Sequence, residues 1–353
     1  MSGDITEAEN YYSKDFEWEQ LRLEVETDPT FLYHLLPFNS DGVSNSTTDS
    51  SNSSPLEDSD AWNKFHSRHS TGKFFKERRY LLKEFPELAC RGHSKVLEVG
   101  CGNGSTALPI LRATENSVIY ACDCSNEALD RAKENISAAN LTTAQDRFHP
   151  FLCDVSTFEF PKWLACISCQ ERFMTAGETQ YSLCSEERTC CIGGVDLVTL
   201  VCSLCAYFYL EPLCFYLKFC WQTRSLYINY LLLFYLTYQI FTLSALPLHR
   251  MTMAIKQCFS VLKPGGILLF RDYGLYDMTM LRFYPEQRVG YREYMRSDGT
   301  RSYFFSLEFT RDLFSSAGFT ELELEYCCVR STNRRNGKIM RRVWVHGKFQ
   351  KGK

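Results

Sequence analysis

The chain has 353 residues, of which 45% are hydrophobic and 23% are charged, and its formal net charge is −3. This is the composition of an ordinary globular protein that can bury a sizeable core. A charge so close to neutral excludes a general affinity for nucleic acid, so any contact with RNA must come from a local basic cluster.

The first residues lack the basic and then apolar pattern of a signal peptide, although the chain contains 17 cysteines. We therefore expect reduced thiols in an intracellular protein, located in the cytoplasm with the nucleus as an additional location. Residues 1–38 read as an N-terminal extension with one short helix. Residues 39–60 are almost wholly Ser, Asn, Asp and Thr, which predicts a disordered linker. The folded domain is expected over residues 61–353.

From Lys95 onward, short apolar runs alternate with stretches of helical periodicity. The expected strands are 96–99, 118–122, 148–153, 195–200 and 267–271, the expected helices are 106–113, 126–139 and 251–262, and two more strands are expected at 321–329 and 341–349. Alternating strands and helices imply right-handed βαβ units. The sequence thus predicts an α/β fold with a doubly wound, seven-stranded, mostly parallel sheet.

A glycine-rich turn follows the first expected strand. Glu98 precedes glycines at positions 100, 102 and 104, which let the backbone turn sharply and approach a ligand. Asp123 ends the second strand, where such folds place an acid that accepts hydrogen bonds from ribose hydroxyls. Nicotinamide-dependent enzymes use a related glycine pattern. The acidic-first spacing instead resembles the first motif of class I methyltransferases, which implies S-adenosyl-L-methionine (SAM) as the cofactor, Asp123 on its ribose and Asp154 on its adenine amino group.

Further blocks narrow the resemblance. The segments 73–88 and 262–277, the latter ending in FRDYGLYD, and the segment DGTRSYFF at 298–305 resemble the methyltransferase-like family that forms 3-methylcytidine in the anticodon loop of tRNA. The resemblance runs from about residue 61 to residue 349, apart from the middle of the chain. It implies tRNA as the substrate and an aminoacyl-tRNA synthetase or another accessory protein as a further partner, and neither a membrane nor a metal is expected.

The family's cofactor contacts can be carried over position by position. They fall on Trp62, His66, Gly100, Gly102, Asp123, Asp154, Val155 and an aliphatic residue after the fourth strand, which is Val201 or Ile240. The family usually has Tyr in place of His66 and often His in place of Arg79. Trp62 has an equal alternative as a core aromatic residue.

The reaction that the resemblance implies needs no general base, because N3 of cytosine carries a free lone pair. A carboxylate near the developing positive charge would assist, and Asp272, just past the fifth strand, is the candidate catalytic residue. The alternative is a structural acid paired with Arg271 or Arg301. The expected RNA contacts are Arg78, Arg79, Tyr273, Arg282, Arg301, Arg334 and Arg335, with solvated loops and core packing as the alternatives.

The middle of the chain is unlike its surroundings. Residues 201–239 are rich in Tyr, Phe, Leu and Cys, and the stretch 225–249 is long enough and apolar enough to span a bilayer. Removing 201–239 joins VDLVTL to IFTLSALP and restores a continuous family motif, and the boundary codons suit a splice junction. The favoured hypothesis is therefore an in-frame retained intron or a gene-model error, with a membrane segment as the alternative.

Other interpretations stay open. The enzyme could act on a small molecule or a protein instead of tRNA, or the insertion could leave an inactive binding module. Cys166 and Cys169, with Cys184, Cys190 and Cys191, could bind zinc, but the later cysteines lack the second paired spacing. A surface loop with reduced thiols is the simpler interpretation.

Overall fold

The central element of the molecule is a seven-stranded sheet. The computed structural model of the chain describes residues 14–38, 55–68, 77–89, 92–141, 143–165, 194–201, 242–332 and 339–353. The strands of the large sheet are β1 (Lys95–Val99), β2 (Val118–Asp123), β3 (Phe148–Leu152), β4 (Val195–Val201), β5 (Leu262–Tyr273), β9 (Phe319–Thr332) and β10 (Ile339–Lys351). Their order is β3-β2-β1-β4-β5-β10-β9. The first five strands are parallel, and β10 runs antiparallel to both β5 and β9.

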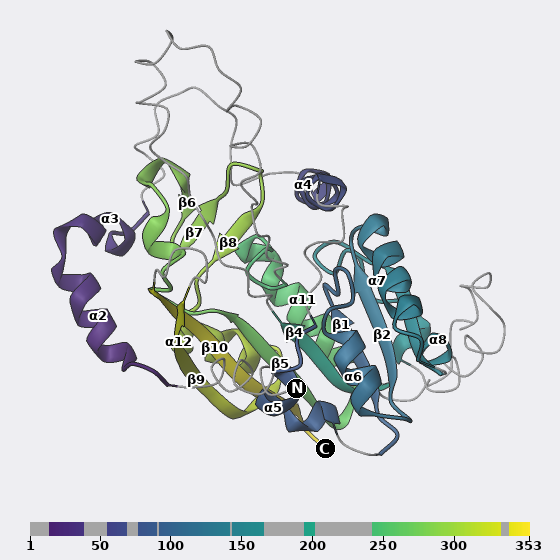
Figure 1. Cartoon of the computed structure of the whole chain (residues 1–353). Coiled ribbons are helices and arrows are strands. Elements are labelled where there is room, and N and C mark those ends of the chain that lie inside the picture. The colour runs from purple at the N-terminus through teal and green to yellow at the C-terminus, as the bar shows by residue number, and fades with distance from the viewer. Residues whose placement is uncertain are drawn as a thin grey trace, which may run out of the picture.

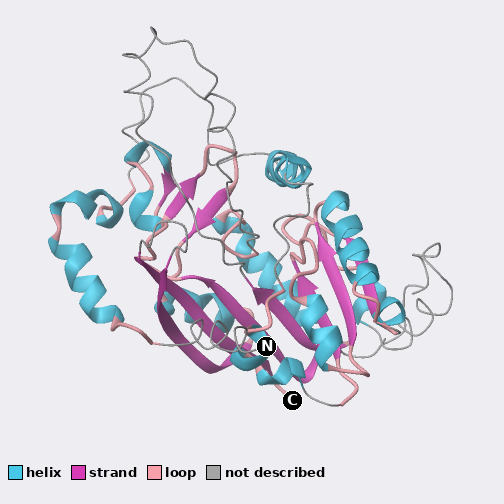
Figure 2. Cartoon of the chain, viewed as in Figure 1, coloured by secondary structure: helices cyan, strands magenta, loops and turns pink. Residues whose placement is uncertain are grey.

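This topology confirms the predicted fold class (Figures 1 and 2). The helices that connect or cover the strands are α6 (Ala107–Ala113), α7 (Asn126–Ala138), α11 (Leu248–Val261) and α12 (Leu307–Ser316), and shorter helices lie at α5 (Leu81–Glu84) and α8 (Ala144–Arg147). Serines cap two of them: Ser125 accepts a hydrogen bond from Ala128 N at 3.4 Å, and Ser306 from Phe309 N at 3.3 Å. These side chains satisfy amide groups that the first turn of a helix leaves without a partner.

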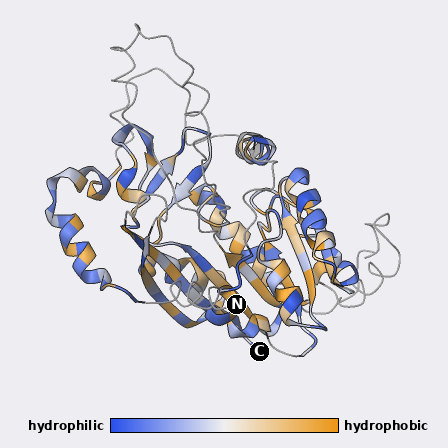
Figure 3. Cartoon of the chain, viewed as in Figure 1, coloured by the Kyte–Doolittle hydropathy of each residue, from blue (hydrophilic) through white to orange (hydrophobic). Residues whose placement is uncertain are grey.

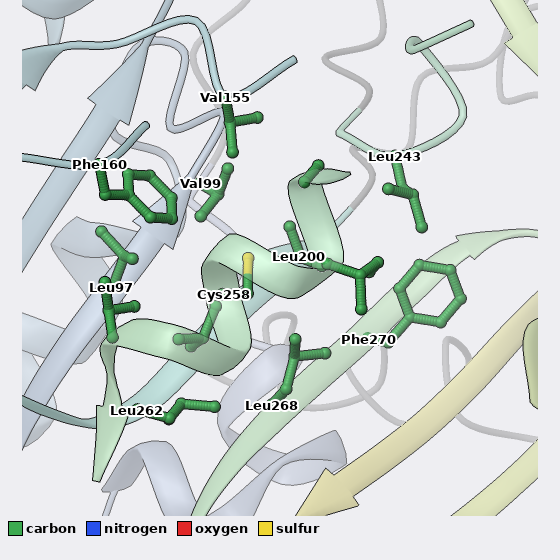
Figure 4. Close-up of a cluster of buried hydrophobic side chains, with 14 of the residues drawn as sticks. Leu97, Val99, Val155, Phe160, Leu200, Leu243, Cys258, Leu262, Leu268 and Phe270 are labelled. Atoms are coloured by element: carbon green, nitrogen blue, oxygen red, sulfur yellow. The ribbon is translucent and has the colours of Figure 1, made fainter. Parts of the chain in front are cut away.

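Two hydrophobic cores lie on opposite faces of the sheet, because neighbouring residues of a strand point to opposite sides. On β2, Tyr120 and Cys122 belong to the core that contains α11 and α12, whereas Ile119 and Ala121 belong to the core that contains α6 and α7. Figure 4 shows part of the first core, where strand residues lie around Cys258 of α11. In Figure 3 strands β1 and β2 are mainly hydrophobic, whereas α7 carries many hydrophilic residues.

A second lobe stands beside β5, β9 and β10. It contains a small antiparallel sheet of three short strands, β6 (Arg288–Gly290), β7 (Glu293–Met295) and β8 (Arg301–Tyr303). The N-terminal helices α2 (Trp18–Thr27) and α3 (Leu32–Leu35) lie next to it (Figure 1). None of these three strands was expected from the sequence.

The N-terminal helices are fixed to this lobe by specific contacts. The Trp18 ring stacks on Tyr326 at 4.6 Å and on Tyr276 at 5.8 Å, and its Nε1 donates to Leu275 O at 3.1 Å. His34 Nδ1 lies 2.6 Å from the hydroxyl of Tyr294. The described part of the predicted extension is therefore packed against the C-terminal half of the chain.

Helix α4 (Pro55–Arg68) begins six residues before the expected start of the folded domain, with a proline at its first helical position. The described helices include none that is long and apolar enough to cross a bilayer. Residues 202–239 of the anomalous segment and the cysteine-rich stretch 166–191 lie outside the described residues. Among the described residues, no group of three His, Cys, Asp or Glu side chains could hold a metal ion.

A buried ion cluster joins the segment before β1 to the antiparallel end of the sheet. Arg271 on β5 is fully buried, and its Nη1 donates to Glu84 Oε1. His346 on β10 lies 3.1 Å from the same Glu84 oxygen and 3.1 Å from Glu323 on β9. Because its charge is buried, Arg271 depends on the carboxylate of Glu84.

Replacing Glu84 by Ala would leave the Arg271 guanidinium buried without its carboxylate. We expect the free energy of unfolding, measured by urea denaturation, to fall by about 3–5 kcal/mol. As a matched control, Glu321→Ala removes the ion pair with Arg311, whose side chain is 48% exposed. That change should cost less than about 1 kcal/mol. Equal losses for the two variants would contradict the assignment.

Candidate active site

The centre of the site is the turn between β1 and α6. Gly100, Gly102 and Gly104 have φ angles of 69°, 51° and 77°, in a region where a side chain would be strained. A Cβ on Gly104 would also lie 3.3 Å from the Cβ of Ala132, so α7 packs directly on the turn. The turn lies at the carboxyl end of β1, between β2 on one side and β4 on the other. Open α/β sheets bind ligands at such a switch point.

The two predicted acids lie at the same edge. Asp123 is buried, and its Oδ2 accepts from Gly102 N at 2.9 Å while its Oδ1 accepts from Ser125 N at 3.0 Å. Asp154 is half-buried, and its Oδ1 accepts from Ser156 N at 2.9 Å. Because β2 and β3 are neighbouring parallel strands, the two carboxylates follow one another along the edge. Val155 is buried beside Asp154.

Helix α4 lies between β8 and α7 in Figure 1. Ser67 donates to Glu127 Oε2 on α7 at 2.6 Å. Trp62 and His66 are one helical turn apart, therefore on one face of α4, and both side chains are buried. Burial lowers the pKa of His66, while the carboxylates of Asp123 and Glu127 oppose this shift. The structure thus brings His66 close to the acid that is expected to bind ribose.

Trp62 packs in the core cluster of the second lobe, which also contains Ala245 and Tyr273. Both interpretations of Trp62 therefore remain compatible with its position, since it is a core residue on the helix face that carries His66. Val201 ends β4 and is buried. Ile240 lies outside the described residues.

Glu98, the acid that precedes the glycines of the turn, was not among the predicted site residues. Glu98 is buried on β1, and its Oε2 has no hydrogen-bond partner among the described residues. Burial raises the pKa of Glu98 to about 7, against the opposing influence of Arg78. Its place two residues before the first glycine was the signal in the sequence. An unpartnered buried carboxyl oxygen and a side-chain-free turn fit a ligand such as SAM, whose methionyl part carries an ammonium group.

Asp272, the predicted catalytic carboxylate, is fully buried at the end of β5. Its Oδ2 accepts from Ser244 N at 2.9 Å and its Oδ1 accepts from Tyr273 N at 2.8 Å. Ser244 O in turn accepts from Tyr303 N at 2.9 Å. The carboxylate therefore clamps the loop after β4 to β5 and to the second lobe. This geometry favours a positioning role over direct contact with the transferred methyl group.

The two arginines named in the alternative pairing of Asp272 each have another carboxylate partner. Arg271 pairs with Glu84, and Arg301 pairs with Glu293 at 3.0 Å. Neither ion pair involves Asp272.

The expected RNA contacts divide into several groups. Arg78 and Arg301 are buried, so neither guanidinium presents a charge to solvent. Tyr273 is fully buried. Its ring stacks on Phe304 and Trp344, with centroid distances of 5.1 Å and 5.2 Å, and an RNA base would have to stack on the same ring. The burial of these three side chains favours the alternative of core packing, and their contact with RNA stays a prediction.

The other predicted contacts lie elsewhere. Arg79 is exposed and pairs with Glu77 at 3.0 Å. Arg282 is half-buried in the second lobe, and burial lowers its pKa. Arg334 and Arg335 lie outside the described residues.

Replacing Asp272 by Asn distinguishes a positioning role from a catalytic role, because Asn keeps the shape of the side chain and removes its charge. An Asn side chain accepts with one oxygen only, so one of the two backbone amides would lose its acceptor. We expect affinity for S-adenosylhomocysteine (SAH), thermal stability and turnover to fall together. Calorimetry, thermal unfolding and single-turnover assays measure the three. A fall in turnover alone, by about 100-fold, would restore the catalytic role.

The chain is similar in sequence to known methyltransferases. A model of the methyltransferase domain family matches residues 73–324. The chain is 32% identical over 295 residues to tRNA N(3)-cytidine methyltransferase METTL6 of Rattus norvegicus, covering 82% of this chain and 78% of that protein. It is 30% identical over 329 residues to METTL2 of Danio rerio, covering 82% and 72%.

A solved structure of the N-methyltransferase NodS from Bradyrhizobium japonicum, in complex with SAH, is 12% identical with a TM-score of 0.43, over 82% of this chain and 98% of that one. The sheet order, the glycine turn and the family match agree with one another. The chain belongs to the SAM-dependent methyltransferase family that includes the tRNA N(3)-cytidine methyltransferases.

Proposed function

We propose that this chain transfers a methyl group from SAM to N3 of cytidine in the anticodon loop of a tRNA. The observation that carries the proposal is the extent of the similarity to METTL6, which covers 82% of the chain. The first five strands and their helices alone are too short to account for a match over 82% of the chain. The match therefore includes parts outside the cofactor half of the sheet, where the substrate would be selected.

The mechanism rests on positioning. When bound, SAM supplies an electrophilic methyl group, and N3 of cytosine supplies the lone pair. No proton has to leave N3, so the absence of a free carboxylate at Asp272 does not prevent the reaction. The turn at Gly100 and Gly102 leaves the backbone open to the cofactor. Asp123, which accepts from Gly102 N, is the proposed partner of the ribose hydroxyls. Holding donor and acceptor in line is the main contribution left to the protein.

The clamp at Asp272 shapes the acceptor side of the site. Through Ser244 it fixes the loop that follows β4, and Thr242 of this loop donates to Val99 O at 3.3 Å, at the base of the glycine turn. The described part of this connection, residues 242–247, thus contacts both the cofactor turn and the strand that leads to the second lobe. The expected consequence is a fixed distance between the bound methyl group and the base.

The substrate base must be unpaired, because N3 lies on its pairing edge. The hairpin between β6 and β7 offers a surface for such a strand. Tyr291 is 47% exposed, and the guanidinium of Arg292 lies 4.7 Å from its ring centroid. Arg292 also has a φ of 62°, a strained value for a side chain that is often kept for function. Aromatic and guanidinium groups together are typical of single-stranded RNA contacts.

The geometry around the anomalous middle segment supports the insertion hypothesis. Val201 and Thr242 are 41 residues apart, yet the hydroxyl of Thr242 lies 3.5 Å from Val201 O. The segment therefore leaves and re-enters the fold at one place, beside the cofactor turn. We propose that residues 201–239 are absent from the working enzyme, where Ile240 takes the place of Val201 at the end of the fourth strand.

The proposal also includes an accessory protein such as an aminoacyl-tRNA synthetase. Leu23, Leu32 and Leu36 are exposed on the N-terminal helices, with 64%, 51% and 49% of their surface accessible. Exposed apolar side chains are typical of a protein-docking surface where they gather.

The first experiment measures 3-methylcytidine in unmodified tRNA by mass spectrometry, with the chain as written and with residues 201–239 removed. We expect the shortened chain to be active and the full chain to be much less active. Activity of both forms would show that the segment is tolerated. If neither form methylates tRNA when synthetases are added, but a form methylates a small molecule or a protein, the tRNA assignment fails and the alternative substrate class replaces it.

The hairpin surface is tested with Arg292→Gln in the active form. We expect tRNA affinity to fall about threefold to tenfold, because one cationic contact is lost, while SAH affinity stays constant. Arg311→Gln is the matched control, since it removes an equal charge from an exposed residue of α12. Equal effects of the two substitutions on tRNA binding would place the RNA elsewhere.

A further inference from the structure

Tyr276 adopts a backbone conformation that is rare for a large side chain. It lies in the loop that follows β5, and its φ angle of 66° falls in the left-handed region. Such a conformation persists only where the surrounding structure holds it, and it is common at functional sites. The preceding residue, Leu275, donates through its N to Phe305 O at 2.8 Å, and its O accepts from Trp18 Nε1 at 3.1 Å. Contacts with distant parts of the chain therefore fix this turn.

Helix α2 also holds the side chain of Tyr276. The rings of Trp18 and Tyr276 stack with their centroids 5.8 Å apart. The Tyr276 hydroxyl donates to Glu26 Oε1 at 3.0 Å. Burial raises the pKa of this hydroxyl and the carboxylate of Glu26 raises it further, so the hydroxyl keeps its proton and remains a donor. Two residues of the N-terminal helix thus orient Tyr276.

Arg292, in the hairpin between β6 and β7, faces the same hydroxyl. Its positive charge opposes the rise in the pKa of Tyr276. It has the same effect on Tyr303 of β8 and on Tyr326 of β9, whose pKa values are also raised by burial. Because a charge acts in this way only over a short range, the guanidinium lies close to three tyrosines from three separate elements.

Arg292 has no carboxylate partner among the described residues, although its side chain is half-buried. Its neighbour Glu293 pairs instead with Arg301, at 3.0 Å. A guanidinium has a planar fork of donors that matches the oxygens of a phosphate group. Tyr291, whose ring lies 4.7 Å from this guanidinium, is 47% exposed, so solvent and a ligand can reach the hairpin. The site therefore has the charge, the geometry and the access that an anion requires.

We propose that Arg292 binds a phosphate group of the RNA strand, and that Glu26 is a positioning residue which, through the Tyr276 hydroxyl, keeps the guanidinium turned toward that phosphate. The proposal rests on the proposed function, because it takes tRNA as the ligand. The hydroxyl proton is directed to Glu26, which leaves the lone pairs of the oxygen for the guanidinium. Glu26 acts through Tyr276 and does not itself contact the RNA.

The sign of the expected effect separates this role from simple electrostatics. An acidic side chain beside an RNA surface repels phosphate, so its removal would ordinarily strengthen binding. If Glu26 positions Arg292, its removal weakens binding instead. The salt dependence gives a second readout, because each phosphate contact that is lost lowers the slope of log affinity against log salt by about one.

The experiment measures the affinity for unmodified tRNA by fluorescence anisotropy between about 50 and 200 mM salt. It uses the chain as written and the chain without residues 201–239. With Glu26→Ala we expect affinity to fall about threefold to tenfold and the salt slope to fall by about one, as with Arg292→Gln. The double variant should bind no more weakly than Arg292→Gln alone. SAH affinity, measured by calorimetry, should stay constant in all of them.

Three further variants complete the design. Glu26→Gln keeps an oxygen that can accept from Tyr276, so tRNA affinity should stay within about twofold of wild type. Tyr276→Phe removes only the hydroxyl and should repeat the effect of Glu26→Ala. Glu19→Ala is the matched control, because it removes an acid of the same helix that pairs with the exposed Arg22. It should bind tRNA at least as tightly as wild type.

Each outcome decides the proposal. It is overturned if Arg292→Gln leaves the salt slope unchanged, if Glu26→Ala binds tRNA as tightly as wild type or more tightly, or if the double variant is weaker than Arg292→Gln. If Tyr276→Phe does not fold, the two Glu26 variants give the decision, since Glu26 is exposed. If neither form of the chain binds tRNA, the proposal and the proposed function fall together. If tRNA is bound with the expected pattern but is not methylated, the site stands and only the proposed reaction fails.

Discussion

The backbone path of the turn after β1 is the constraint on which the site depends. Glycines at 100, 102 and 104 take φ angles that other residues adopt only with strain, and this path brings Gly102 N to the carboxylate of Asp123. Helix α7 packs against the same turn at Gly104. Arg78, in the segment before α5, forms hydrogen bonds with Ser105 and Thr106 next to it. Cofactor binding, the attachment of α7 and the placing of the upstream segment are therefore consequences of one local conformation.

Much of this could be predicted because its signals are local. The first five strands contain short apolar runs. Asp123 is the last residue of β2, and Asp154 lies two residues after the end of β3. The strands of the small sheet are three residues long, too short for a periodicity to be recognised in a sequence. Residues 14–38 were expected as a separate extension. Their sequence alone does not indicate that Trp18 stacks on the distant residues Tyr276 and Tyr326.

The roles of charged and aromatic residues were harder to predict than the strands. Arg78 and Tyr273 were expected to meet RNA because basic and aromatic side chains are typical of such surfaces. Their burial depends on Thr106, Phe304 and Trp344, which are 28 or more residues away along the chain. The carboxylate of Asp272 accepts hydrogen bonds from two backbone amides. Because every residue except proline has such an amide, these partners could not be predicted from the sequence.

The closeness of Val201 and Thr242 also has a thermodynamic consequence. Closing a chain of 41 residues between two neighbouring points costs on the order of 3 kcal/mol of conformational entropy. A typical domain is stable by about 5–15 kcal/mol, so this cost alone would leave the sheet folded. Natural selection or a splicing error could therefore place extra sequence here without destroying the fold. Its effect would fall on access to the cofactor turn, because both ends of the segment lie beside that turn.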